Sequence, residues 1–221
     1  MKNMSFYKIL GKSKYLHFYA KSFYYNHFKH ITLISGGDCR IKKLHLESCG
    51  KHNVIRLGNH VLLDEVTITI FGNNNEIVIN DMNYLSNIRF AIEDDANQIE
   101  IGKQCYLGPG CLLAALEGTK IKIGDDCMIA SSCEIRTSDS HSLLDLNGER
   151  INYAQDIILG GHVWIAMGSL ILKGANIPKD CVVAAKAVVC KMKEQVKEGS
   201  LLGGTPARVL KENISWNHKR I

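Results

Sequence analysis

The residues with the clearest chemical potential lie in the segment RTSDSHSLLDLNGERIN, residues 136–152, which contains His141. A histidine is largely uncharged near neutral pH, because its ordinary pKa is about 6.5, so it can accept a proton from a reacting hydroxyl as a general base. Asp139 could hold the imidazole tautomer, and Glu134 is a second candidate for that role. A loop histidine taken alone is more often a solvated surface residue, so this interpretation depends on its context.

The chain on both sides of this segment repeats a large aliphatic residue at every sixth position. The longest run is Leu159, Ile165, Ile171, Ile177, Val183 and Val189, and shorter runs lie at 101–113 and 123–135. Neither the 3.6-residue period of a helix nor the alternation of a strand gives an interval of six. A hexapeptide β-helix does, because each six-residue side of a triangular coil points one aliphatic residue inward. The sequence therefore predicts an all-β solenoid.

The eight cysteines predict neither a disulfide framework nor a zinc knuckle. Most of them fall on the repeat, where a smaller residue follows each aliphatic position by four; these are Cys105, Cys111, Cys127, Cys133 and Cys181. Such cysteines behave as small apolar residues. The chain has no CxxC motif, and eight cysteines in 221 residues is a low density for a disulfide-stapled protein.

The chain divides into a basic N-terminal segment and a nearly neutral body. Residues 1–37 hold six lysines and no acidic residue, although the chain as a whole has 27 Lys and Arg against 22 Asp and Glu. Nucleic-acid binding is not expected, because the body carries no basic stripe. No apolar run approaches the roughly 20 residues of a membrane span, and no signal-peptide core is visible, so we expect a cytoplasmic protein.

Residues 1–30 contain nine of the sixteen aromatic residues of the chain. We expect them to form a helical cap that covers the first coil, since the terminal repeats of a solenoid need a seal. With its lysines the same segment could instead lie on an anionic membrane, as a peripheral contact at the inner membrane face. The expected organisation is a cap at 1–30, a β-helix domain at 31–195 with a protruding loop at 136–156, and a turn with a short helix at 196–221.

The motifs VWIAMGSLILKGANIP, CVVAAKAVVCK and GTPARVLKE resemble the hexapeptide-repeat acyltransferases, whose β-helix is left-handed. Within that group, EIRTSDSHSLLDLNGERIN followed by DIILGGHVWI is similar to bacterial capsule and surface-polysaccharide O-acetyltransferases, including the sialic acid capsule enzymes. The resemblance implies a homotrimer with active sites between subunits. It also implies transfer of acetyl from acetyl-CoA to a carbohydrate hydroxyl, with His141 as the general base.

The resemblance also implies positions for the two substrates. Trp164, together with Arg136, would contact the carbohydrate acceptor. The residues expected along acetyl-CoA, from the pantetheine arm to the nucleotide end, are Met167, Ala185, Lys186, Cys190, Lys191, Arg208 and Lys211. The cations among them suit the phosphates of coenzyme A. Lys173 and Lys179 are expected on an ordinary solvated face.

Two departures from the family pattern affect the cofactor groove. The glycine usual after VWI is Ala166, and the usual glycine and serine of the next coil are replaced at Ala184, Lys186 and Ala187. These changes leave open an alternative in which the protein is a non-catalytic scaffold. Such a scaffold would not bind acetyl-CoA. An acetyltransferase for a nucleotide sugar or for a small xenobiotic such as chloramphenicol is the other alternative, which acceptor assays would separate.

A metal enzyme of the gamma carbonic anhydrase type on the same fold is rejected. Its zinc site needs several converging histidines, and only His141 and His162 lie in the repeats after residue 60. His162 is expected to be a corner residue rather than a ligand, and no metal is expected to be required.

Overall fold

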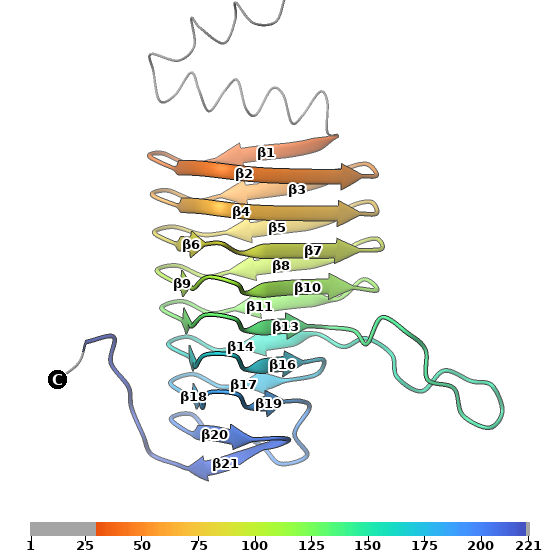
Figure 1. Cartoon of the computed structure of the whole chain (residues 1–221), viewed down its shortest axis with the longest axis vertical. Helices are drawn as coiled ribbons and strands as arrows, with labels where there is room; N and C mark the ends of the chain where they lie inside the picture. The colour runs from red at the N-terminus through yellow and green to blue at the C-terminus, as the bar shows by residue number, and fades with distance from the viewer. Residues whose placement is uncertain (1–29, 220–221) are drawn as a thin grey trace, which may run out of the picture.

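The computed structural model describes residues 30–219, whose strands wind into a parallel β-solenoid with a long loop projecting from one side (Figure 1). The all-β prediction is confirmed, and the first strand begins at Ile31, where coils were expected to start. Within 30–219 there is no helix, and hence none long and apolar enough to cross a membrane. The helical cap predicted for the N-terminus falls in residues 1–29, outside the described part.

Three stacks of strands form the faces of the solenoid. The first face contains β6 (Tyr84–Ser86), β9 (Tyr106–Leu107), β12 (Met128–Ile129), β15 (Trp164–Ile165), β18 (Val182–Val183) and β20 (Leu201–Gly204). The second contains β7 (Arg89–Glu93), β10 (Leu112–Leu116), β13 (Glu134–Arg136), β16 (Leu170–Leu172) and β19 (Val188–Val189). The third contains β1 (Ile31–Ser35), β3 (Asn53–Leu57), β5 (Glu76–Ile79), β8 (Gln98–Ile101), β11 (Lys120–Ile123), β14 (Ile157–Leu159) and β17 (Asn176–Ile177). The long strands β2 (Arg40–Cys49) and β4 (Leu62–Phe71) run across the first two faces, because β4 pairs with both β6 and β7.

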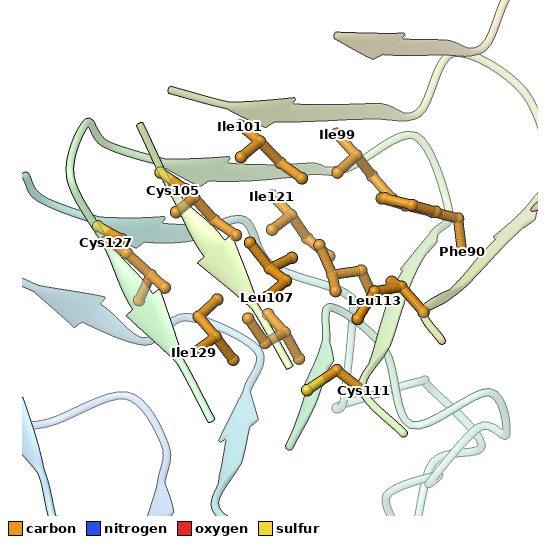
Figure 2. Close-up of a cluster of buried hydrophobic side chains, with 14 of the residues drawn as sticks. Phe90, Ile99, Ile101, Cys105, Leu107, Cys111, Leu113, Ile121, Cys127 and Ile129 are labelled. Atoms are coloured by element: carbon orange, nitrogen blue, oxygen red, sulfur yellow. The ribbon is translucent and has the colours of Figure 1, made fainter. Parts of the chain in front are cut away.

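The aliphatic residues of the six-residue repeat fill the interior, as predicted. Leu159, Ile165, Ile171, Ile177 and Val183 are all at most 1% exposed, and they belong to a single core cluster. Figure 2 shows how side chains from the three faces, such as Phe90, Ile101 and Leu107, point toward one another inside the coils. The core is therefore a continuous apolar column along the solenoid axis.

The cysteines expected on the repeat are also buried. Cys105, Cys111, Cys127, Cys133 and Cys181 are each at most 2% exposed, and all eight cysteines are free thiols. In Figure 2, Cys105 and Cys127 lie one above the other in successive coils. Burial raises the pKa of the Cys181 thiol, so this side chain stays protonated as a small apolar residue.

The coils before and after the loop differ in length. Paired residues in the early coils are 22 positions apart, as in Glu76 beside Gln98, whereas the later pair Ile158 and Asn176 is 18 apart, which is three hexapeptides. The longer corners of the early coils hide the six-residue interval in this half of the sequence.

A column of buried polar side chains joins the early coils. Asn53, Asn75 and Asn97 are at most 1% exposed, and each side-chain oxygen accepts a hydrogen bond from the backbone N–H one coil later, at 3.0, 2.8 and 3.0 Å, the last donor being Thr119. Buried backbone donors need such partners where the chain turns a corner. The column therefore fixes both the height and the register of successive coils.

The short helix predicted in 196–221 was wrong. Residues 207–211 form strand β21 (Ala207–Lys211), which pairs antiparallel with β20, and residues up to 219 form no helix. β20 itself stacks in parallel on β18, so the solenoid extends beyond residue 195. A strand at this end hydrogen-bonds to the open edge of the last coil, whereas a helix would leave that edge unpaired.

Asn75→Ala should lower the free energy of unfolding by about 1–3 kcal/mol, because the buried N–H of Asn97 would lose its acceptor. The measurement is denaturant unfolding at one fixed protein concentration. Asn176→Ala, at an exposed position of β17, is the matched control and should change stability by less than about 0.5 kcal/mol. Equal effects of the two substitutions would contradict a stabilising role for the column.

Candidate active site

The loop that carries His141 leaves the solenoid at the corner between the second and third faces. β13 ends at Arg136 and β14 begins at Ile157, so the connection runs through residues 137–156 (Figure 1). Its first residue, Thr137, is fully buried, and its hydroxyl hydrogen-bonds to that of Thr119 at 2.6 Å. Thr119 is the last member of the column that starts at Asn53, so the loop departs from the column's end.

An ion pair holds the returning arm of the loop against the coil before it. Arg150 donates a hydrogen bond from Nη2 to the carboxylate of Glu117 at 2.9 Å, and its Nη1 forms an ion pair with the other carboxylate oxygen at 2.7 Å. The hydroxyl of Ser138 donates to the same carboxylate. These donors hold the pKa of Glu117 below its ordinary value, with the Arg150 contact as the main cause. Both arms of the loop therefore converge on one carboxylate.

A second set of contacts surrounds the backbone of His141. The buried Asn152 amide donates to the His141 carbonyl and to the Asp139 carboxylate, both at 2.8 Å, and accepts from the N–H of Leu143 at 2.7 Å. The ammonium of Lys173 binds both the Asp139 carboxylate and the Asn152 carbonyl. Asn152 thus ties the outgoing arm of the loop to the returning arm beside His141.

The carboxylates proposed to orient His141 have other partners in this structure. The contact with Lys173 lowers the pKa of Asp139, so this carboxylate is ionised and paired with an ammonium. Glu134 accepts from Arg136 at 2.6 Å, and Arg136 in turn donates to the hydroxyl of Ser140 at 3.2 Å. The His141 side chain is exposed. The loop therefore presents the imidazole outward, with Glu134 and Arg136 at its base.

Trp164 lies on a different part of the solenoid from the loop. It is the first residue of β15 on the first face, and its ring is 5.9 Å from that of Trp216. Trp216 stacks on His162 at 4.3 Å and donates to the His162 carbonyl at 2.8 Å. The C-terminal segment therefore folds back over the corner between the third and first faces. Within one chain, Trp164 and the His141 loop belong to different faces and corners.

The residues expected along the cofactor fall into separate groups. Met167, Ala185 and Lys186 share the corner between the first and second faces, where the Lys186 N–H donates to the Met167 carbonyl at 3.0 Å. Arg208 pairs with Gly203 near this corner, whereas Lys211 pairs with Leu201 at the other end of β20. Cys190 and Lys191 follow β19, near the corner that carries the loop. Among the long side chains of the first group, Met167 and Lys186 are exposed.

Lys186 occupies a backbone conformation that favours glycine. Its φ is 63°, and Gly168 directly above it in the same corner has a φ of 70°. A Cβ on Gly168 would lie 2.7 Å from the Lys186 ammonium, so the lysine side chain fills the space over that glycine. The substitution of a glycine or serine by Lys186 thus places a positive charge along the corner column.

Sequence reasoning missed four residues that position the loop: Glu117, Arg150, Asn152 and Lys173. The expectation that Lys173 lies on a solvated face was wrong, because its side chain is only 18% exposed and binds Asp139. Their partners are distant in sequence, from nine residues for Asn152 with the N–H of Leu143 to 34 for Lys173 with Asp139. No local pattern in the sequence marks such contacts.

Comparison with known proteins supports the resemblance seen in the sequence. No family model matches the chain. A polysialic acid O-acetyltransferase of Neisseria meningitidis is 35% identical over 87 residues, which is 39% of this chain and 40% of that protein. A protein of the same description from Escherichia coli O1:K1 / APEC is 32% identical over 83 residues, covering 37% of this chain and 26% of the relative. The matched stretches thus span less than half the length of these curated relatives.

The similarity of fold covers much more of the chain. The crystal structure of the polysialic acid O-acetyltransferase OatWY superposes with a TM-score of 0.67 and 27% identity, covering 86% of this chain and 93% of that one. The predicted resemblance to hexapeptide-repeat acyltransferases is therefore confirmed in both sequence and fold. The chain is a parallel β-solenoid similar to the polysialic acid O-acetyltransferases.

Proposed function

We propose that this chain is an acetyl-CoA-dependent O-acetyltransferase that acetylates a sugar hydroxyl of a bacterial capsule or other surface polysaccharide. The observation that carries the proposal is the single long interruption of the solenoid, a loop anchored at both arms that presents His141. The likeness to polysialic acid O-acetyltransferases in sequence and fold supports the acceptor class.

In the proposed reaction, the imidazole of His141 accepts the proton of the acceptor hydroxyl. The oxygen then attacks the carbonyl carbon of the acetyl thioester, so that a C–O bond forms and the C–S bond breaks. The proton held by His141 passes to the departing thiolate, which leaves as free coenzyme A. Glu134 or Asp139 would stabilise the protonated imidazole, and Arg136 and Trp164 would contact the sugar.

The distribution of site residues over separate corners favours a homotrimer. The loop at one corner and Trp164 on another face would meet if a neighbouring subunit supplied one of them. The loop also carries apolar side chains that are at least 59% exposed, namely Leu143, Leu144, Leu146, Ile151 and Tyr153. A second copy of the chain would cover this apolar surface.

We propose that the coils wind left-handed, as the resemblance implies.

The proposed cofactor path follows the corner between the first and second faces. Met167, Ala185 and Lys186 would contact the pantetheine arm, and Arg208 and Lys211 at the last strands would approach the phosphates. Cys190 and Lys191 lie near the loop corner and would contact the nucleotide end only across a subunit interface. No metal is part of the proposed chemistry.

We further propose a cytoplasmic location, with residues 1–30 as a cap on the first coil or a peripheral contact with the inner membrane face. Co-sedimentation with anionic vesicles, compared with a chain lacking those residues, separates the two roles.

His141→Ala should reduce kcat by about 10²–10⁴-fold while acetyl-CoA still binds, because the substitution removes the base and leaves the solenoid intact. The measurement is release of the coenzyme A thiol with polysialic acid as acceptor. His52→Asn is the matched control, since His52 is exposed with a φ of 60° that asparagine tolerates, and it should retain full activity. Activity of His141→Ala equal to wild type would sink the proposed base. Turnover only with nucleotide sugars or chloramphenicol would show that the acceptor is a small molecule and not a polysaccharide.

Acetyl-CoA should raise the unfolding temperature of wild type and of His141→Ala alike, since ligand at 100 times its Kd stabilises by about 2.7 kcal/mol. Arg208→Glu should diminish this shift, because a carboxylate at β21 repels the phosphates. Lys122→Glu makes the same charge change at an exposed position of β11 on the third face and should leave the shift intact. Absence of a shift in wild type at millimolar acetyl-CoA would favour a scaffold without catalysis.

Glu117→Gln should loosen the loop, because an amide cannot form the charged pair with Arg150. We expect faster proteolysis within 137–156 and a lower kcat.

Acid should also loosen the loop in the wild-type protein and speed its proteolysis. The pKa values of Glu117 and Asp139 are lowered in the fold, so their contacts are fully present above the ordinary carboxyl range near pH 4 and are lost as pH falls below it. A proteolysis rate unchanged in Glu117→Gln would show that this pair does not hold the loop.

A further inference from the structure

We propose that Asp126, His162 and His218 form a binding site for Zn²⁺ that fastens the C-terminal segment to the solenoid. The three residues come from two successive coils and from the C-terminal segment. One potential ligand atom of each lies within 4.8 Å of the others. The site lies apart from the His141 loop, and its zinc takes part in no step of the proposed acyl transfer.

The two solenoid residues are held at fixed spacing by the stacking of the coils. Asp126 and His162 occupy the same corner, between the third and first faces, with φ of 57° and 52°. The N–H of His162 donates to the carbonyl of Asp125 at 2.7 Å, which locks the two corners one above the other. Because these positions belong to a packed solenoid, the geometry of two ligands is set before any metal binds.

The third coil at this corner supplies a partner for the imidazole of His162. Asp180, with a φ of 60°, accepts from Nδ1 of His162 at 2.8 Å. An ionised carboxylate can only accept, so Nδ1 donates in this contact and Nε2 is the ring nitrogen left to bind a metal. Metal-binding histidines usually have such a carboxylate or carbonyl on the second ring nitrogen. The contact with Asp180 thus orients the His162 ring as such a partner orients a metal ligand.

The C-terminal segment brings His218 to the same corner. Trp216 stacks on the ring of His162 and donates to its carbonyl, and His218 packs edge-on against Trp216 at 4.6 Å. Nε2 of His218 is 3.1 Å from Oδ1 of Asp126, where a proton now joins the two groups. A divalent cation would replace that proton and bind both.

The donor set selects the class of cation. Two imidazoles and one carboxylate suit Zn²⁺ and its neighbours in the first transition row, whereas Ca²⁺ and Mg²⁺ take oxygen ligands. Three protein ligands leave a position for water on zinc. The rejection of a carbonic anhydrase site considered only histidines in the repeats, and His218 lies outside them. The metal inferred here is a fastening for the segment, which fixes Trp216 beside Trp164.

The test measures Zn²⁺ bound to the full-length protein, by calorimetry and by metal content after treatment with chelator and dialysis against Zn²⁺. Wild type should bind one equivalent more than His218→Gln and than Asp126→Asn. Asparagine tolerates the left-handed conformation of residue 126, so the second substitution leaves the corner intact. Asp180→Asn should retain the site with an affinity about 10–100-fold weaker. Cys49 has an exposed thiol in all of these proteins, so any zinc that it binds would add equally to each measured zinc content.

His60→Asn is the matched control. His60 and Asp38 also face each other at a corner, with 3.8 Å between Nδ1 and the carboxylate and with φ of 55° and 54°. This pair lacks the third ligand, because His218 contacts Asp126. This variant should bind as much Zn²⁺ as wild type. In hydrogen exchange, Zn²⁺ should slow the amides of 212–219 in wild type and not in Asp126→Asn. Equal zinc content in wild type, His218→Gln and Asp126→Asn would overturn the proposal.

Discussion

Successive coils of this solenoid hydrogen-bond to each other in parallel, and this stacking turns each position of a coil into a column along the axis. The interior columns are aliphatic side chains and cysteines, and one corner column is a run of asparagines that supplies acceptors to buried backbone donors. A change at one coil therefore acts on its neighbours. The stacking also means that inserted residues fit only at corners, where the chain leaves the strands. The loop of residues 137–156 is such an insertion.

The sequence predicted the parts of the fold that repeat locally. The interval of six from Leu159 to Val189 predicted the interior of the later coils, and the buried cysteines at repeat positions were also as expected. For the early coils the sequence predicted strands and turns but no regular repeat, because their longer corners set equivalent residues of successive coils 22 positions apart. The helix expected after Pro206 was wrong, since Ala207–Lys211 pairs with the last coil and that partner is fixed only by the completed solenoid.

For the candidate site, the sequence predicted the loop that carries His141. It could not predict that Glu117 and Lys173 hold the loop, since an ion pair across stacked coils depends on register rather than on nearby residues. The sequence predicted His162 at a corner, but it could not predict, for the same reason, that Asp126 and Asp180 lie at that corner too. Stacking brings these residues together across coils of different length, so no constant interval in the sequence marks them.

The antiparallel strand β21 has a consequence for how the protein behaves in a crowded solution. A parallel solenoid ends in an open row of backbone donors and acceptors, which could pair with the end of another copy and continue without limit. Here the first face ends in a strand of opposite direction, on which Arg208 and Lys211 are exposed. A second molecule meeting this end would find reversed polarity and like charges. On this face, β21 therefore disfavours continued parallel stacking of another copy.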